Sequence, residues 1–240
     1  MTLLHPLPDI TLRLCPERAA LWLERATLFV ADLHLGRTAA PAADHAGAVD
    51  RTLERLHAVV QQYAAKRLVI LGDAFHMRRS YTTEVLERVT HWRTSLAALD
   101  IVLVRGNHER ILGDPPTTLQ ITCVDPGYSE DGMMFVHEPR SVDGYTIGAH
   151  LHPCVLVPST RVAAQAVPCF VIGKQYLVLP AFEDQLPGRL FTTVRMNPMP
   201  PSKMGQYFSN EHSHNYPVAT RSADCTRGHR MDHRHPRSQC

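Results

Sequence analysis

Residues 27–34 read TLFVADLH, an apolar run that leads directly into an aspartate and a histidine two positions apart. The pattern recurs in LVILGD at residues 68–73 and in IVLVRGNHE at residues 101–109. Each apolar run is short and rich in Val, Ile, Leu or Phe, as in strands that are buried on both faces of a parallel sheet. The three stretches therefore predict parallel strands with polar residues at their carboxyl ends.

Two helical patterns lie between these strands. In both stretches apolar residues recur every three or four positions, so that each set occupies one face of a helix. The first set is Val49, Leu53, Leu56 and Val60, and the second is Val85, Val89, Trp92, Leu96 and Leu99. The alternation of strands and helices predicts parallel βαβ units.

Four later apolar runs follow one another without helices between them: Met133–Val136, Tyr145–Gly148, Cys169–Ile172 and Tyr176–Leu179. This succession predicts a second, mostly antiparallel sheet. Near the N-terminus, Ile10–Leu14 and Ala20–Glu24 are expected to form a hairpin. Together the elements predict an α/β fold with two sheets.

Composition divides the chain into two parts. The 240 residues have a formal net charge of +2, with 44% hydrophobic and 20% charged residues, as is typical of a globular protein. Residues 1–195 contain 19 basic and 20 acidic side chains and are predicted to form one domain, whereas residues 196–240 contain six basic and three acidic ones. Val218 is the only Val, Ile or Leu after residue 195. We therefore expect 196–240 to be a disordered His/Arg-rich tail that buries too little apolar surface to fold.

The six cysteines form no CxxC pair and show no even spacing. They indicate neither a zinc ribbon nor a disulfide framework, and reduced thiols in a cytoplasmic protein are the simplest interpretation. No apolar run approaches the roughly 18 residues of a transmembrane helix. The first residues also lack a basic start followed by an uninterrupted apolar stretch. We expect neither export nor a membrane anchor.

Side chains of the kind that bind metals follow five of the predicted strands. They are Asp32 and His34; Asp73; Asn107, His108 and Glu109; His137; and His150 and His152. Ligand sites of open α/β sheets lie beyond the carboxyl ends of the strands, so at least the first three clusters are expected to converge. Oxygen and imidazole donors without a thiolate favour Mn, Fe or Zn. Glycines at positions 72, 106 and 148 permit the backbone to approach such ions closely.

The series DLH, GD, GNHE, H and HLH, between residues 32 and 153, resembles the calcineurin-like metallophosphoesterase superfamily. The longer strings ADLHLGR, LGDAFH, RGNHE, VHEP and HLHP resemble its bacterial ligase-associated DNA damage response endonuclease branch. The resemblance implies a two-sheet αββα sandwich and metal-dependent hydrolysis of phosphodiester bonds in DNA. It also implies an ATP-dependent DNA ligase and a helicase as partners.

The resemblance further implies a centre of two divalent ions, with Mn expected and Fe or Zn as alternatives. One ion is assigned to Asp32, His34, Asp73 and His152, and the other to Asp73, Asn107, His137 and His150. Asp73 bridges both ions in this assignment. A bridging water, expected to be hydroxide near neutral pH, would attack phosphorus in line.

Three further residues match the branch. His108 corresponds to its catalytic histidine, and Arg37 and His76 are candidates for substrate contacts. Glu109, which stands where the branch more often has Asp, is expected to orient His108. Ala149 replaces the usual glycine before the fifth motif.

Other functions remain open at this point. A phosphomonoesterase or cyclic-nucleotide phosphodiesterase can use the same ligands with a differently shaped pocket, and a non-catalytic scaffold for the ligase or helicase can retain the fold. The four basic residues Arg78, Arg79, Arg105 and Arg110 lie near the motifs and are candidates for contacts with a nucleic-acid backbone.

Overall fold

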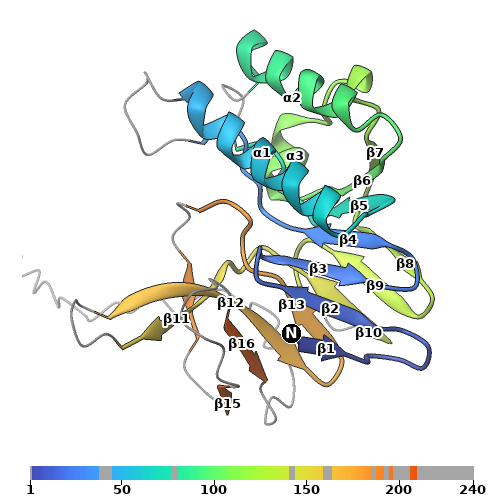
Figure 1. Cartoon of the computed structure of the whole chain (residues 1–240), viewed down its shortest axis with the longest axis vertical. Coiled ribbons are helices and arrows are strands. Elements are labelled where there is room, and N and C mark those ends of the chain that lie inside the picture. Colours follow the sequence, from blue (N-terminus) through green and yellow to red (C-terminus); the bar gives the residue numbers. More distant parts are fainter. Residues whose placement is uncertain are drawn as a thin grey trace, which may run out of the picture.

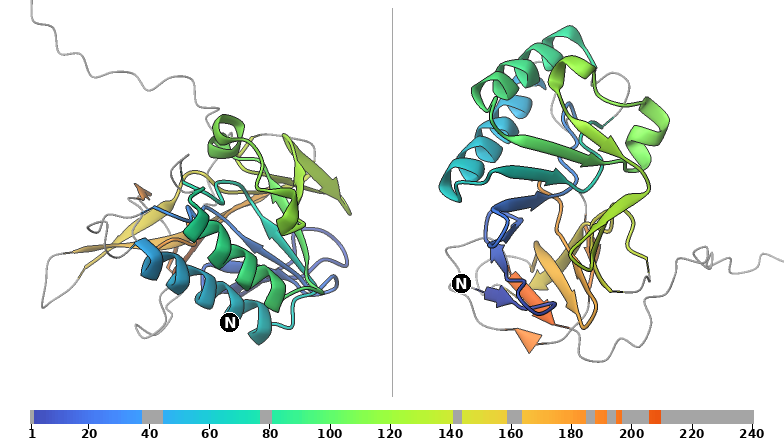
Figure 2. Two further views of the ribbon diagram at one scale, coloured as in Figure 1. Left: turned by 90° about the horizontal axis from the view of Figure 1, so that it is seen from above. Right: turned by 90° about the vertical axis from the view of Figure 1, so that its right-hand side faces the viewer.

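The computed structural model describes residues 2–37, 45–76, 81–140, 144–158, 164–184, 188–191, 195–196 and 206–209. Two sheets stack on each other, and helices cover the outer face of the first (Figures 1 and 2). In the described part of the chain, no helix is long and apolar enough to cross a membrane.

The first sheet has seven strands that follow the order of the sequence. They are β1 (Thr2–Leu4), β2 (Leu12–Cys15), β3 (Ala19–Trp22), β4 (Thr27–Val30), β5 (Arg67–Ile70), β6 (Asp100–Val104) and β7 (Thr122–Val124). Strands β1 to β4 pair antiparallel, and β4 to β7 pair parallel. The β2–β3 pair confirms the predicted hairpin, and the register Val30↔Ile70↔Leu103 aligns the carboxyl ends of the three predicted parallel strands.

Helices α1 (His45–Gln62) and α2 (Thr83–Ser95) connect the parallel strands as predicted. Their apolar stripes pack on the first sheet, and Val49, Leu56 and Val89 are all buried in that core. Thr82 caps α2 by accepting a hydrogen bond from the backbone N–H of Val85 at 3.3 Å. A shorter helix, α3 (Asn107–Leu112), and a 3₁₀ turn, η3 (Thr117–Leu119), follow β6.

The second sheet has the order β14-β11-β12-β13-β10-β9-β8, with β16 beside β12 and β15 beside β16. Its strands are β8 (Gly127–Glu130), β9 (Met133–Val136), β10 (Tyr145–Gly148), β11 (Pro153–Val157), β12 (Gln165–Gly173), β13 (Tyr176–Val178), β14 (Arg189–Leu190), β15 (Arg195–Met196) and β16 (Gln206–Ser209).

The prediction that this sheet is mostly antiparallel was wrong, because β10 pairs parallel with both β9 and β13. After β9 the chain crosses back to the end of the sheet at which β9 begins. Strands β9 and β10 therefore run in the same direction. Their carboxyl ends therefore lie together, which is required for the site described below.

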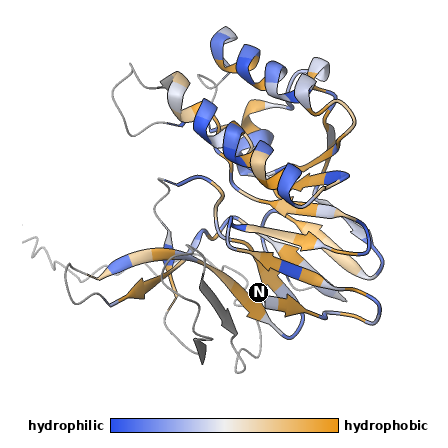
Figure 3. Ribbon diagram, viewed as in Figure 1, coloured by the Kyte–Doolittle hydropathy of each residue, from blue (hydrophilic) through white to orange (hydrophobic). Residues whose placement is uncertain are grey.

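A second core fills the space between the sheets. Phe29 of the first sheet contacts Phe135 of the second, with ring centroids 4.9 Å apart, and both side chains are fully buried. Ile147 and Leu177 extend this core along the second sheet. Figure 3 shows that the strands of both sheets are mainly hydrophobic, whereas the helices are mixed. This packing confirms the predicted two-sheet sandwich.

The structure describes only part of the predicted tail. Within residues 196–240, strand β16 pairs parallel with β12 through Cys169↔Gln206 to Ile172↔Ser209. Residues 197–205 and 210–240 lie outside the described residues. The disorder of that part stays a prediction.

Candidate metal centre

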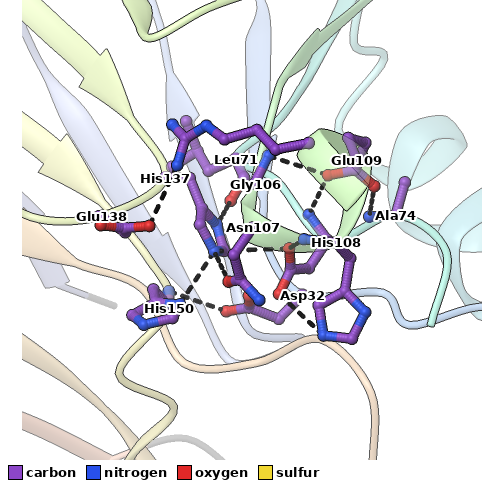
Figure 4. Close-up of polar contacts among 12 residues, drawn as sticks. Asp32, Leu71, Ala74, Gly106, Asn107, His108, Glu109, His137, Glu138 and His150 are labelled. Atoms are coloured by element: carbon purple, nitrogen blue, oxygen red, sulfur yellow. Dashed lines mark hydrogen bonds and ion pairs between the residues drawn. The ribbon is translucent and has the colours of Figure 1, made fainter. Parts of the chain in front are cut away.

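The predicted ligands lie at the carboxyl ends of parallel strands in both sheets. Strands β4, β5 and β6 lead into Asp32, Asp73 and Asn107. In the second sheet, β9 and β10 lead into His137 and His150. Figure 4 shows the side chains of Asp32, Asn107, His137 and His150 converging from the two sheets. The arrangement follows the rule for ligand sites of α/β sheets.

Three groups of donor atoms form at this edge: one contains His34, His76 and His108, and the other two consist of predicted ligands alone. In each group the ligand atoms of three side chains lie within 4.8 Å of one another: Asp32, His34 and His152 in the first group, and Asp73, His137 and His150 in the second. Asn107 joins the second group, since its Oδ1 lies 3.1 Å from Nε2 of His137. The structure thus brings all seven predicted ligands together.

Asp73 lies between the two groups. Its Oδ2 is 3.7 Å from Nε2 of His34 in the first group, and its Oδ1 is 3.5 Å from Nε2 of His137 in the second. A carboxylate can share its two oxygens between two cations. Asp73 therefore lies where one of its oxygens can bind an ion in each group.

Five of the seven residues have left-handed backbone conformations. The φ angles are +53° at Asp32, +42° at His34, +52° at Asp73, +65° at His150 and +42° at His152. Asp and His tolerate this region better than most residues, but it still costs roughly 1–2 kcal/mol each. Backbone bonds hold the conformation in place: the N–H of Asp32 donates to Gly72 O at 3.2 Å, and that of His34 donates to Asp73 O at 2.9 Å.

The donor atoms fit divalent ions. His137 donates its Nδ1–H to the carbonyl of Leu71 at 2.8 Å, so its Nε2 carries a lone pair toward Asn107 Oδ1 and toward His150 Nδ1 at 3.0 Å. Among the described residues, Asp32 Oδ1 and His34 Nε2 are buried and form no hydrogen bond. Buried acceptors without donors are costly, and a cation between them removes that cost. Oxygen and imidazole nitrogen donors of this kind bind divalent metal ions.

Burial favours the neutral form of two site histidines, His34 and His150. It lowers the pKa of His34 to about 2, with help from the neighbouring rings of His108, His152 and His76. Burial also lowers the pKa of His150, and the nearby His137 adds to the effect. A neutral imidazole has the free lone pair that a metal ligand needs.

His108 lies at the start of α3, beside Asp73. Its backbone N–H donates to Asp73 Oδ1 at 3.0 Å, its ring Nδ1 contacts the carbonyl oxygen of His76, and its Nε2 is 3.7 Å from Asp73 Oδ2. A proton on Nδ1 therefore satisfies the His76 carbonyl and leaves Nε2 facing the centre. The side chain is 24% exposed, so a substrate can reach it.

Comparison with known proteins decides the family. The model of the calcineurin-like phosphoesterases matches residues 26–216. The chain belongs to this family. Its members are metal-dependent phosphoester hydrolases. The two donor groups of this phosphoesterase are therefore candidates to hold the metal ions that such chemistry uses.

Two solved structures are similar to the phosphoesterase. Pseudomonas putida nuclease MPE shares 31% sequence identity and gives a TM-score of 0.72 over 81% of this chain and 92% of that one. Yfce, a phosphoesterase from E. coli, gives a TM-score of 0.36 with 16% identity, over 65% of this chain and 79% of that one. No curated protein matches the chain significantly.

His76 and Arg37, the two predicted substrate contacts, both lie against His34 in the phosphoesterase. Nδ1 of His76 is 3.2 Å from Nδ1 of His34, and the backbone N–H of Arg37 donates to the carbonyl of His34 at 2.9 Å. If His34 donates its Nδ1–H to His76, its Nε2 is left to face Asp73. His76 thus contacts both His34 and His108 from behind the ligands, a place that the GDxxH pattern of the resemblance also implied.

Glu109 does not orient His108 as predicted. Its carboxylate accepts hydrogen bonds from the backbone N–H groups of Gly106, Asp73 and Ala74, each at 2.9 Å. Figure 4 shows the Glu109 carboxylate between Gly106 and Ala74. Glu109 therefore ties the chain after β5 to the start of α3, and so fixes the backbone of Asp73 and Asn107.

Replacing Glu109 by alanine is expected to lower the free energy of unfolding by about 3 kcal/mol or more, because three buried N–H groups lose their acceptor at roughly 1–3 kcal/mol each. The midpoint of urea denaturation measures the loss. Glu84→Ala is the control, since Glu84 is 62% exposed and forms only an ion pair with Arg88 on the helix surface. Equal midpoints for the two variants would contradict the assigned contacts.

Two glycines of the phosphoesterase make room for side chains of the site. A Cβ at Gly72 would lie 2.2 Å from His137 Nδ1, and a Cβ at Gly106 would lie 2.1 Å from Asp73 Oδ1. The sequence indicated glycine at these positions for the approach of the backbone to metal ions. The structure instead shows that the ligand side chains themselves occupy the space.

The basic residues near the motifs are less available than predicted. Arg105 forms two bonds of 2.6 Å with Asp114, and Arg110 pairs with Asp125 and Glu138, both at 3.1 Å. These partners neutralise both guanidinium groups. Arg78 and Arg79 lie outside the described residues.

Proposed function

We propose that this phosphoesterase is a phosphodiesterase with a dinuclear metal centre, and that it acts on DNA as an endonuclease. The observation that carries the proposal is the position of Asp73, whose two oxygens face two complete donor groups with His108 at its side. A phosphomonoesterase can use similar ligands, so the substrate class has to be tested directly.

In this proposal one ion is held by Asp32, His34, His152 and Asp73. The other is held by Asp73, Asn107, His137 and His150. Mn is the proposed metal, with Fe or Zn as alternatives. When bound, such ions lower the pKa of a water molecule and stabilise charge on the phosphoryl oxygens. The neutral amide of Asn107 keeps the negative charge of its site low, which strengthens the Lewis acidity available there.

His108 is proposed as the catalytic acid. Its Nε2 faces the centre and can hold a proton for the leaving oxygen, while the carbonyl of His76 fixes the ring from behind. Arg37 follows His34 by three residues. It is proposed to contact a substrate phosphate, because a guanidinium donates two parallel hydrogen bonds to phosphate.

DNA as the substrate is supported by the 31% identity with a nuclease that the chain covers over 92% of its length. We extend the proposal to the ligase-associated DNA damage response branch, with an ATP-dependent ligase and a helicase as partners, on the strings quoted from the sequence. A cytoplasmic location belongs to the same proposal and is supported by the free thiols of Cys15, Cys123, Cys154 and Cys169.

His108→Ala is expected to reduce kcat by about 10²- to 10⁴-fold, the usual contribution of a general acid. Because His108 is not among the seven proposed ligands, the content of bound metal is expected to stay at the wild-type level. Steady-state kinetics and metal analysis of the same preparation check both parts. Loss of metal in this variant would contradict the assigned role.

A panel of substrates tests the proposed function. The full chain is assayed with Mn, Mg, Fe and Zn on a bis-aryl phosphate, an aryl monophosphate, cyclic nucleotides, and closed circular, nicked and single-stranded DNA. We expect cleavage of the diester and of closed circular DNA, which shows endonuclease action. Turnover of the monoester alone would overturn the diester proposal, and cleavage of cyclic nucleotides without DNA would overturn the nuclease assignment.

A further inference from the structure

The segment that follows β13 contacts the backbone of two ligands of the first group. Of residues 181–191, the structure describes 181–184 and 188–191, which we call the bracing segment. Its Glu183 N–H donates to the carbonyl of Asp32 at 3.3 Å, and its Arg189 N–H donates to the carbonyl of His152 at 3.0 Å. Both ligands have left-handed backbones, which need such support.

Close packing reinforces these two bonds. The Phe182 N–H donates to the carbonyl of Ala31 at 2.7 Å, and the Phe182 side chain is fully buried in the core beneath the helices. At the other end, a Cβ at Gly188 would lie 2.6 Å from the carbonyl oxygen of His152. One end of the bracing segment thus packs against the backbone of Ala31 and Asp32, and the other end packs against the backbone of His152.

Two arginines fix the bracing segment to the first sheet and its helix. Arg18, in the turn between β2 and β3, donates to the carbonyls of Glu183 at 3.0 Å and Ala181 at 3.4 Å. Arg55 of α1 donates to the carbonyl of Phe182, and its guanidinium lies 4.1 Å from the centre of the Phe182 ring. Three consecutive carbonyls are therefore bound by two guanidinium groups.

Asp184 completes the contact. Its Oδ1 lies 2.9 Å from Arg18 and 2.5 Å from Arg55, so one carboxylate pairs with both cations. The Arg18 side chain is only 8% exposed, and a guanidinium so deeply buried is tolerated only with a full set of acceptors. This arrangement is more extensive than a surface ion pair and is directed at one stretch of backbone.

The second group is held differently. His137 is fixed through Leu71 O, and the carbonyl of His137 accepts the N–H of Ala149 at 2.9 Å. Within the described ranges, no hydrogen bond or ion pair joins Asn107, His137 or His150 to the bracing segment itself, but the His150 N–H donates to Asp32 Oδ2 of the first group at 3.2 Å. The bracing segment therefore contacts the first group directly and reaches the second group only through the residues of the first.

We infer that Arg18, Arg55 and Asp184 are positioning residues that set the metal affinity of the first group through the bracing segment. The inference rests on the proposed dinuclear function. Outer contacts of metal ligands usually change affinity by about 10–100-fold when they are removed. Loosening the bracing segment is expected to weaken the ion of the first group in this range and to weaken the other ion much less, because the second group is reached only indirectly, through the bond from His150 to Asp32.

The test measures Mn binding to the full chain by calorimetry and by electron paramagnetic resonance, in which two coupled ions differ from a single ion. Asp73→Asn serves as the reference for ions that bind elsewhere, including the histidines of residues 196–240. Relative to this reference, the wild type is expected to bind two ions. Arg18→Met is expected to bind one ion with nearly the wild-type affinity and the other at least about tenfold more weakly.

Two further variants make the result specific. Arg67→Met is the matched control, since Arg67 forms a partly buried pair with Glu130 at 2.8 Å at the amino end of β5 and is expected to leave both ions unchanged. If Arg18→Met loses its helical circular dichroism, Asp184→Asn replaces it, because Asp184 is 60% exposed and both arginines keep their carbonyl partners. The same selective loss is expected.

The outcomes separate this inference from the proposed function. Equal weakening of both ions, or no weakening, in a folded Arg18→Met or Asp184→Asn protein would overturn the positioning role alone. A wild type that binds no more Mn than Asp73→Asn would overturn the dinuclear centre, and the positioning role with it.

Discussion

Replacing Asp73 by asparagine is expected to reduce kcat/KM for phosphoester hydrolysis by about 10³-fold or more, which corresponds to roughly 4 kcal/mol of lost transition-state stabilisation. The two carboxylate oxygens of Asp73 face ring nitrogens of both donor groups, His34 Nε2 at 3.7 Å and His137 Nε2 at 3.5 Å. Asparagine keeps the size of the side chain and tolerates the φ of +52°. The loss is therefore expected to come from the missing charge and not from a change of fold.

Kinetics, metal analysis and circular dichroism of Asp73→Asn together check this expectation. Asp131→Asn is the matched control, because Asp131 also has a left-handed backbone, with φ +49°, and pairs only with Arg25 at the surface. The control is expected to keep the wild-type rate. Wild-type activity in Asp73→Asn would show that the centre does not depend on this carboxylate.

Gly72→Ala is expected to lower activity by about 10²-fold or more and also to destabilise the fold. The new Cβ would lie 2.2 Å from His137 Nδ1 and 2.9 Å from the Cα of Gly106. The His137 ring therefore has to leave its position in the second group. A displacement of about 1 Å at a catalytic centre can cost 10²-fold in rate. The φ of +81° at Gly72 adds a cost of roughly 1–2 kcal/mol for any residue with a Cβ.

Gly113→Ala separates the two causes. Gly113 has a φ of +88°, but a Cβ there would have no neighbour within 4 Å. This variant is expected to lose stability by the backbone cost alone and to keep its activity. Thermal unfolding and initial rates of the two variants, measured side by side, decide the matter: an equal loss of activity in both would refute a steric role for Gly72.

Much of the fold could be predicted from residue patterns. The continuous apolar runs gave β4, β5 and β6 with their parallel order, and the 3.6-residue period gave α1 and α2. Strands β7 and β8 were missed because they are short and carry polar residues, as in TCV and GYSE. The parallel pairing of β9 with β10 was missed because strand order along the chain does not determine the direction in which a connection returns.

The place of the candidate site was predictable from the sequence. Polar residues after successive strands indicated where metal-binding side chains gather, and the family resemblance assigned seven of them as ligands and His108 as the catalytic residue. The structure brings these residues together, and their roles stay predictions. The left-handed backbones of five of these residues were not predictable, because Asp and His adopt several conformations and the hydrogen bonds of neighbouring strand ends select this one.

Contacts between segments far apart in the sequence were also beyond prediction. Glu109 binds backbone groups 35 and 36 residues away, and Arg18 binds carbonyls 163 and 165 residues away. Nothing in the local sequence indicates such partners. The pairing of Arg105 with Asp114, nine residues apart, shows that even near partners depend on how the chain turns after a helix.

The division of the ligands between the sheets bears on how the protein matures. The first group takes Asp32 and His34 from one sheet and His152 from the other, and the second group is divided in the same way. Neither sheet alone carries a complete set, so high-affinity metal uptake has to wait until the sandwich has closed. During refolding, circular dichroism is therefore expected to recover before metal is retained. A slightly loosened inter-sheet core would appear first as an inactive, metal-poor protein that still contains its strands and helices.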